Sequence, residues 1–273
     1  MTTSGSYDIR ESHRDAKAEI ERLAAQARLG WEKEARTLSW FGLKDGMSLI
    51  ELGSGPGFIT ELLLTLVPNS LITCLEIDPK LLKRAEQYLQ NKAHHRVHFV
   101  EGSVMNIRLA DNSFDFAYAR LLFQHLPDPV GAAKEIRRVL KPGDKLVIYD
   151  IDDEIFGLIQ PPIPEFSAVL EKLGQAQSAG GGNRRVGRSL WRILKAAGFS
   201  NLDLEVVASH SDNIGIEPFL PQIDPDRLLP LVKTGLVSEQ ELENIRSSRH
   251  KFLASPEPYI FTLSLMVCGE KSN

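Results

Sequence analysis

The chain has 273 residues, of which 42% are hydrophobic, so it is long enough to bury a full hydrophobic core. Its formal net charge of −4 excludes the broad basic field that is typical of nucleic-acid-binding proteins. Two cysteines are too few for a disulfide framework, and the first residues lack the charged and apolar regions of a signal peptide. Composition therefore predicts a cytoplasmic protein that has neither a nucleic-acid nor a membrane partner.

The first expected elements are helical. Residues 8–40 carry apolar side chains at the spacing of one or two amphipathic helices. We expect residues 1–45 to form an N-terminal helical cap and residues 46–273 to form the main domain.

A glycine-rich turn follows in the run Leu49-Ile-Glu-Leu-Gly-Ser-Gly-Pro-Gly-Phe58. Two apolar residues lead into Glu51, and glycines then occupy positions 53, 55 and 57, which is typical of a buried strand, a tight turn and a helix. Glycine lets the backbone bend sharply and approach a ligand closely. A dinucleotide-binding fingerprint would need glycine or alanine where the chain has Phe58. A nucleotide site and an ordinary strand-to-helix turn remain as alternatives.

A second strand, Leu71–Glu76, ends in an acid about 20 residues beyond the last glycine. A carboxylate at that position can accept hydrogen bonds from both ribose hydroxyls of an adenosine. Asp78 and Pro79 then form a helix start, because Asp is a good N-cap and Pro suits the first helical position. The alternative is that Glu76 is a solvated strand end.

The next elements continue the alternation of strands and helices. We expect strands in residues 96–101, 116–120 and 145–150, with a loop at Gly102-Ser103-Val104 and a helix that ends near Pro142-Gly143. Residues 46–155 are thus predicted to form four βα units and a fifth strand, in a parallel sheet with helices on both faces.

The rest of the chain, from residue 156 onward, is less regular. Residues 156–186 are predicted to be a Pro- and Gly-rich connection, followed by a helix at 188–197 and a strand at 201–210. Residues 217–254 are expected to be helical, and residues 259–268 are expected to form the last strand. Both irregular segments, about 156–186 and 214–254, are predicted to be lid-like insertions.

Five sequence features follow one another along the chain and are informative together. They are the glycine turn, Glu76, the loop at 102–104 and the segments Asp111-Asn-Ser-Phe-Asp115 and His125-Leu-Pro-Asp-Pro129. Together they resemble the class I S-adenosylmethionine (SAM) dependent methyltransferases, and within them the ubiquinone/menaquinone-biosynthesis-like small-molecule group. The resemblance covers roughly residues 40–155. It implies an α/β fold with a Rossmann-like, doubly wound, seven-stranded sheet whose strand 7 is antiparallel. About 50 residues separate strands six and seven here, so we expect a helical insertion between them.

The same resemblance implies SAM as cofactor, with S-adenosylhomocysteine (SAH) as product. It assigns cofactor binding to thirteen positions, which are Glu51, Gly53, Ser54, Gly55, Gly57, Glu76, Ile77, Gly102, Ser103, Val104, Ala119, Arg120 and Gln124. At position 103 the family commonly has an Asp that accepts from the adenine amino group, whereas the Ser103 hydroxyl accepts without a charge.

His125 is the candidate catalytic residue, because the ordinary pKa of histidine suits a general base. Its alternative role is to hold the loop by a hydrogen bond. The acidic residues Asp150, Asp152 and Asp153 could hold Mg²⁺, but a solvated acidic loop is preferred and no metal site is predicted. Arg184 and Arg185 could clamp an anionic substrate, against the alternative of a solvated loop.

The predicted function is therefore methyl transfer to an O, N or C atom of a small organic molecule by a monomer or homodimer. Two other interpretations stay open. One is a SAM-binding protein with a non-methylating or regulatory function, and the other is an NAD-dependent oxidoreductase.

Overall fold

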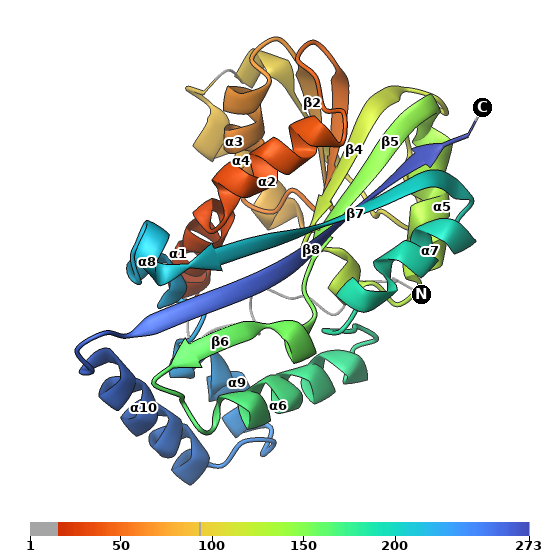
Figure 1. The fold of residues 1–273 in the computed structure, drawn as a ribbon. Helices are drawn as coiled ribbons and strands as arrows, with labels where there is room; N and C mark the ends of the chain where they lie inside the picture. Colours follow the sequence, from red (N-terminus) through yellow and green to blue (C-terminus); the bar gives the residue numbers. More distant parts are fainter. Residues whose placement is uncertain (1–15, 93, 273) are drawn as a thin grey trace.

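The computed structural model describes residues 16–92 and 94–272, in which one mixed β-sheet runs through the molecule between two layers of helices (Figure 1). The strands are β1 (Ser48–Leu52), β2 (Leu71–Glu76), β3 (Val97–Glu101), β4 (Phe114–Arg120), β5 (Leu140–Asp150), β6 (Gly157–Gln160), β7 (Phe199–His210) and β8 (Tyr259–Lys271). β3, β2, β1, β4 and β5 are neighbours in that order and run parallel. β8 lies antiparallel beside β5, which confirms the predicted antiparallel last strand.

The helices cover both faces of this sheet, as predicted. They are α1 (Ala16–Arg28), α2 (Trp31–Trp40), α3 (Phe58–Leu66), α4 (Pro79–Leu89), α5 (Pro129–Val139), α6 (Phe166–Ala179), α7 (Leu190–Ala196), α8 (Ser211–Ile214), α9 (Leu229–Lys233) and α10 (Glu239–Leu253). α5 and α7 pack their buried side chains into one hydrophobic cluster, while α2 and α3 pack into a second cluster with the strands. Parallel strands need such crossover connections because the end of one strand and the start of the next lie at opposite edges of the sheet.

Local sequence explains where several helices begin. The Asp78 side chain accepts a hydrogen bond from Lys80 N at 2.8 Å, and Asp128 accepts one from Gly131 N at 2.8 Å. Each Asp is followed by a proline, whose fixed φ and missing N–H suit the first helical turn. The predicted helix start at Asp78 is therefore confirmed. The part of the first predicted helix that covers residues 8–15 lies outside the described residues.

The sheet has eight strands rather than the predicted seven. β6 lies within the segment predicted to be an irregular connection, and it pairs antiparallel with β8 from Gly157↔Thr262 to Gln160↔Tyr259. β8 extends beyond the end of β5, so its free edge there can bind another strand. β6 spans only four residues, which is too short to give a recognisable strand pattern in the sequence.

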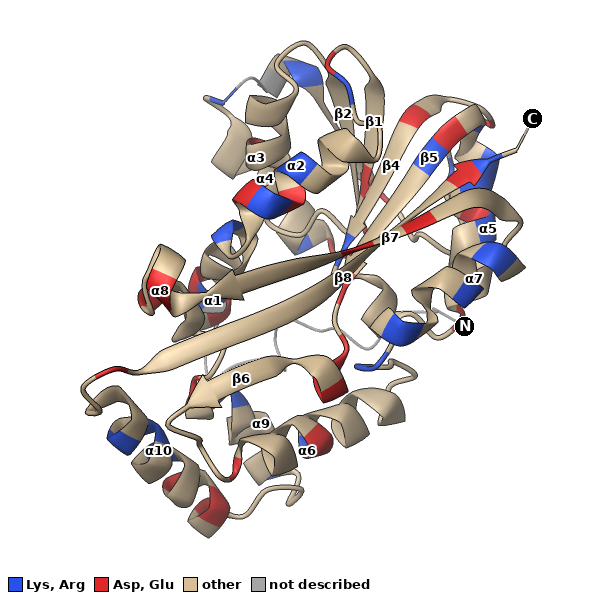
Figure 2. Cartoon of the chain, viewed as in Figure 1, with Lys and Arg blue, Asp and Glu red and all other residues tan. Residues whose placement is uncertain are grey.

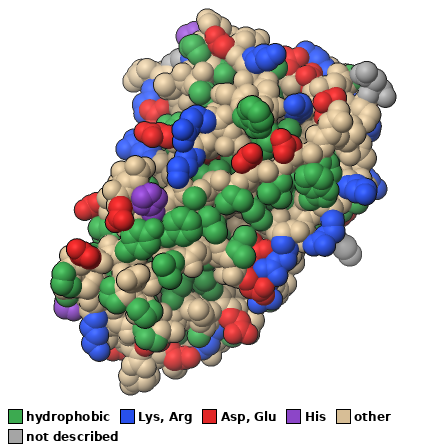
Figure 3. All heavy atoms as spheres, in the orientation of Figure 1, with side chains coloured by type: hydrophobic (Ala, Val, Ile, Leu, Met, Phe, Trp, Pro, Cys, Tyr) green, Lys and Arg blue, Asp and Glu red, His purple; other side chains and the backbone are tan. Residues whose placement is uncertain are grey.

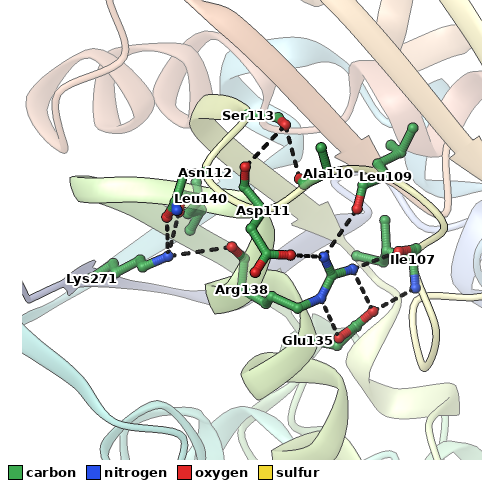
Figure 4. A network of polar contacts seen from close by, with 10 residues as sticks. All are labelled: Ile107, Leu109, Ala110, Asp111, Asn112, Ser113, Glu135, Arg138, Leu140 and Lys271. Atoms are coloured by element: carbon green, nitrogen blue, oxygen red, sulfur yellow. Dashed lines mark hydrogen bonds and ion pairs between the residues drawn. The ribbon is translucent and has the colours of Figure 1, made fainter.

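A second correction concerns the link between β3 and β4, where no helix forms although four βα units were predicted. Residues 102–113 instead form a loop that Arg138 of α5 holds in place (Figure 4). The Arg138 guanidinium donates to the carbonyl oxygens of Ile107 at 2.6 Å and Leu109 at 3.0 Å. Glu135 accepts from Ile107 N at 2.8 Å, so side chains satisfy backbone groups that a helix would have satisfied internally.

The helical insertion predicted between the last two long strands is present. It contains α8, α9, α10 and two short 3₁₀ segments, η5 (Glu217–Phe219) and η6 (Pro225–Leu228). It has its own hydrophobic clusters, one of which is shared with β6, β8 and the start of α6. In Figure 1, α9 and α10 lie together with α6 and β6 below the main sheet, whereas α8 lies beside α1.

Figure 3 shows hydrophobic side chains gathered across the middle of the visible face of the molecule. Leu204 and Val206 of β7 and Leu158 of β6 are among the large exposed hydrophobic residues. Figure 2 shows that the positions of basic and acidic residues are interspersed along the helices. Within the described part of the chain, no helix is both long and apolar enough to cross a bilayer.

Candidate active site

A cavity of about 910 Å³ lies where the parallel strands end, beneath α1 and the insertion. Its wall includes Leu52 of β1, Glu76 of β2, Arg120 of β4 and Tyr149 of β5. The carboxyl ends of strands at a topological switch point are the usual ligand site of open α/β sheets. The volume is near the top of the range of about 300–1,000 Å³ for small-molecule sites, so a cofactor and a substrate can be held together.

The glycine turn forms one wall of the cavity and is open at its centre. Gly55 has a φ of +55°, and a Cβ built there would meet nothing within 4 Å. The neighbouring Ser54 hydroxyl is buried and makes no hydrogen bond within the described residues. An open backbone edge beside an unsatisfied buried hydroxyl fits a polar ligand, such as the amino-acid part of SAM.

Glu76 is held at the second wall by three backbone donors. Its carboxylate accepts from Gly55 N at 2.8 Å, from Ile77 N at 2.8 Å and from Asp78 N at 2.9 Å. Burial raises the pKa of this carboxyl, and the backbone donors oppose that shift. These bonds orient the side chain and connect it directly to the glycine turn.

Glu51 is almost fully buried on the cavity wall. One of its oxygens accepts from the Thr60 hydroxyl at 2.6 Å. Burial raises the pKa of Glu51 to about 8, because few donors compensate the loss of hydration. Without a bound ligand, the Glu51 carboxyl is therefore mostly protonated at neutral pH.

The loop after β3 supplies the third part of the cavity wall. Gly102, Ser103 and Val104 line the cavity, and Ile77 lines it from the end of β2. The Ser103 hydroxyl accepts from Met105 N at 3.2 Å, so part of its accepting capacity is already used within the loop. Val104 packs on the core on one side and lines the cavity on the other, so it presents apolar surface to an aromatic ring in the cavity.

Arg120 lines the cavity, but its charge is used to attach the N-terminal helices. Its Nε lies 3.0 Å from both carboxylate oxygens of Glu34 in α2, and its Nη2 donates to Gln26 O of α1 at 2.9 Å. Tyr118 also donates to Glu34. The guanidinium further lies over the Tyr149 ring, 4.8 Å from its centroid. This buried cluster positions α1 as one side of the cavity.

His125 and Gln124 belong to the short 3₁₀ segment η2 (Phe123–His125) and both line the cavity. Burial, together with the positive charges of Arg184 and Arg22, lowers the pKa of His125 to about 3. The imidazole is thus neutral at physiological pH and a weak base, which favours a hydrogen-bonding role over that of a general base. Gln124 O accepts from Gln177 Nε2 and Asn183 N, both at 2.7 Å, which connects η2 to α6.

Two of the predicted cofactor residues do not line the cavity. Gly57 has a φ of +85° and a Cβ there would lie 3.1 Å from Ala85 Cβ, so its role is close packing of α3 on α4. Ala119 is fully buried in the core of the sheet. The other eleven predicted cofactor residues and His125 all contribute to the wall.

The acidic residues after β5 do not form a metal site. Asp150 accepts from Gln124 N at 3.1 Å and Ile151 N at 2.9 Å, and burial raises its pKa to about 7. Asp152 is paired with Arg188 and Asp153 with Arg184. Within the described residues, no cluster of His, Cys, Asp or Glu is arranged to hold a metal ion.

Sequence reasoning missed several charged residues of the cavity. Arg184 was predicted as an anion clamp but is already bound to Asp153, whereas Arg185 is paired with Glu154 at the surface. The cavity also contains Arg22 of α1 and Arg227 of η6. No local motif marks these two positions, because their approach depends on how the insertion packs against α1.

The comparisons with known proteins agree with this geometry. Residues 50–148 match the family model described as a methyltransferase domain. The chain is 32% identical over 200 residues to methyltransferase phqN of Penicillium fellutanum, covering 72% of this chain and 57% of the relative. It is 30% identical over 139 residues to a demethylmenaquinone methyltransferase of Desulfitobacterium hafniense, covering 50% and 51%. The chain thus spans little more than half the length of these curated relatives.

Solved structures share the fold. A Haemonchus contortus phosphoethanolamine N-methyltransferase 2, in complex with SAH and phosphomonomethylethanolamine, matches with a TM-score of 0.59 at 18% identity. The match covers 89% of this chain and 53% of that one. Residues 50–148 therefore match the methyltransferase domain family, and the chain shares the Rossmann-like fold of these solved structures.

Proposed function

We propose that this protein uses SAM to methylate an O, N or C atom of a small organic molecule, with SAH as the second product. The observation that carries the proposal is the single cavity, which joins the glycine turn and Glu76 to a second region large enough for a substrate. The methyltransferase domain match over residues 50–148 supports the activity. A relative that is named as a demethylmenaquinone methyltransferase supports a small-molecule acceptor.

The cofactor residues take separate roles in this proposal. Glu76 would accept the ribose hydroxyls, because its carboxylate is already oriented at the cavity wall. Ser54 and Gly55 would contact the amino-acid part, where the backbone is open. Val104 and Ile77 would pack against the adenine ring.

The reaction requires little acid–base chemistry from the residues of this chain. SAM supplies a methyl group that its sulfonium already activates for an in-line displacement. The protein must then align the acceptor and exclude water. We assign water exclusion to the N-terminal cap at 1–45 and to the lid segments 156–186 and 214–254. Neutral His125 acts on the cavity wall as a hydrogen-bonding group and not as a base.

We further propose a cytoplasmic setting and a small-molecule partner. Cys74 and Cys268 are buried free thiols, which supports a reducing compartment such as the cytoplasm. The interspersed surface charges support a small-molecule partner over nucleic acid.

Calorimetric titration with SAM, SAH and NAD tests the cofactor. We expect micromolar binding of SAM and SAH, weakened by about 2–4 kcal/mol in Glu76→Ala because charge-assisted hydrogen bonds are lost. Glu86→Ala is the matched control, since Glu86 is an exposed carboxylate on the neighbouring helix α4. Binding of NAD in place of SAM would contradict the proposal.

A second measurement separates catalysis from regulation. SAH should accumulate when the protein is incubated with SAM and an accepted substrate. Tight SAM binding without SAH formation across a broad panel of acceptors would favour a non-methylating SAM-binding protein.

A further inference from the structure

The part of the cavity away from the glycine turn has a mostly apolar wall. The wall there comes from the segment after β5, from α6 and from the insertion, and includes Phe156, Phe166, Leu173, Phe219, Ile223 and Leu231. The Phe156 and Phe166 rings lie with centroids 5.1 Å apart. Such a wall suits a substrate with an apolar body, because burial of apolar surface is the main favourable term there.

Three arginines reach this apolar region, and two of them are paired with carboxylates. Arg22 contacts Glu19 through two hydrogen bonds, at 2.8 Å and 2.7 Å. Arg184 makes a two-point contact with Asp153, in which Nη2 lies 3.1 Å from Oδ1. These four side chains and Arg227 all line the cavity.

Arg227 has no carboxylate partner within the described part of the chain. Its Nη1 donates to the backbone oxygen of Gln222 at 2.6 Å. Neighbouring acids are committed elsewhere, since Asp226 pairs with Arg246 at 2.7 Å and Asp224 accepts from Asp226 N at 3.1 Å. In this region of the cavity, Arg227 is therefore a positive charge that no carboxylate of the described residues contacts directly.

The surroundings of Arg227 favour an incoming anion. Burial and the charges of Arg22 and Arg184 lower the pKa of Arg227 to about 9, so the guanidinium remains charged at neutral pH. Arg227 is only partly exposed, and a charge withdrawn from water without a charged partner is costly, so an anion that binds it recovers part of that cost. The planar guanidinium matches the two oxygens of a carboxylate or phosphate.

We propose that the methyl acceptor is an organic anion, a carboxylate or phosphate monoester on an apolar body, whose charged group binds Arg227. This inference rests on the proposed function, because it assigns the substrate class of the same cavity. Gln222 supports the site, since its side chain accepts from Arg22 Nη1 at 3.0 Å while its backbone oxygen holds Arg227. The anion would thus bind where α1 and the insertion meet.

Calorimetry on SAH-saturated protein with four eight-carbon probes tests the proposal. Octanoate and octyl phosphate should bind about 10- to 100-fold more tightly than octanol, and octylamine should bind more weakly than octanol. The two anions separate a carboxylate site from a phosphate site. Equal binding of octanoate, octyl phosphate and octanol, or no binding of either anion, would overturn the proposal.

Two variants place the preference at Arg227. Arg227→Gln should abolish the preference for the anions and leave SAH affinity unchanged, while Arg227→Lys should retain part of the preference. Arg192→Gln is the control, because Arg192 is exposed and bonds only to Arg188 O within the described residues. A preference that survives in Arg227→Gln would refute the assignment, and failure of SAH to bind the wild type would instead refute the proposed function. The comparison of probes on the wild-type protein decides the case even if a variant does not fold.

Discussion

The carboxyl of Glu51 lies beside the glycine turn with the Thr60 hydroxyl as its donor, and its pKa is raised to about 8. An unfolded chain has an ordinary glutamate, with a pKa near 4.3. Between these two values the native state holds a proton that the unfolded state has lost. Stability in the absence of ligand should therefore fall as the pH rises from about 4.5 to 8.

Glu51→Gln should remove this pH dependence. Glutamine keeps an oxygen that accepts from Thr60 but carries no charge, so the variant should be more stable than the wild type by about 1–3 kcal/mol above pH 7. Urea unfolding at pH 5.5, 7 and 8.5 measures the effect. Parallel stability curves for the two proteins would show that Glu51 is ionised in the free protein.

His125 provides a second test at a single residue. Its pKa is lowered to about 3, so its imidazole should show no proton uptake between pH 5 and 8. An NMR titration of the histidine ring signals measures this, with His125→Gln identifying the signal. A midpoint near 6.5 would restore His125 as a candidate general base.

The cofactor residues could be predicted because their requirements are local. Gly55 needs a left-handed backbone and no Cβ, and Glu76 must follow a strand at a fixed distance, so both leave a pattern in the sequence. The low pKa of His125 could not be predicted, because it depends on burial and on Arg184 and Arg22, which lie about 60 and 100 residues away in the chain. Arg227 was missed for the same reason.

Among the elements, the loop between β3 and β4 relies on one side chain. Arg138→Met would remove the donors to Ile107 O and Leu109 O (Figure 4), so we expect a loss of about 1–3 kcal/mol of unfolding free energy. Arg108→Met is the control, because Arg108 is exposed on the same loop. Thermal or urea unfolding measures both variants, and equal stabilities would mean that the loop is held by its apolar contacts alone.

The N-terminal helices depend on the Glu34–Arg120 pair. Both side chains are almost fully buried, so Glu34→Gln or Arg120→Met alone leaves an uncompensated charge and should cost about 3–5 kcal/mol. The double variant should cost clearly less than the sum of the single ones. Urea unfolding of the four proteins gives the coupling energy, and additive losses would argue against a direct interaction in solution.

Elements with strong periodicity or clear helix starts were predicted well, whereas β6 was not. Its four residues become a strand only because β8 offers an unpaired edge beyond β5. The missing helix after β3 has a similar cause. Arg138 lies in a later helix, so its support of residues 102–113 cannot be found in the loop sequence itself.

Over the whole molecule, one cavity is built from the sheet, α1 and the insertion. SAH should therefore slow amide hydrogen exchange at short labelling times in residues 51–58, in 76–78 and in the cavity side of α1. No residue of α10 is part of the cavity wall, so α10 should not change. Hydrogen-exchange mass spectrometry measures this, and uniform protection of all segments would indicate global stabilisation without a local site.

Strand β8 pairs with β5 through residues 265–270, with β6 through residues 259–262 and with β7 along almost its whole length. A slip by one residue would exchange Met266 and Val267 between the two faces of the sheet and would also turn Ile260 away from the cluster under the insertion. Every pairing partner would oppose the same slip. The register of β8 thus fixes the position of the cofactor wall relative to the substrate wall.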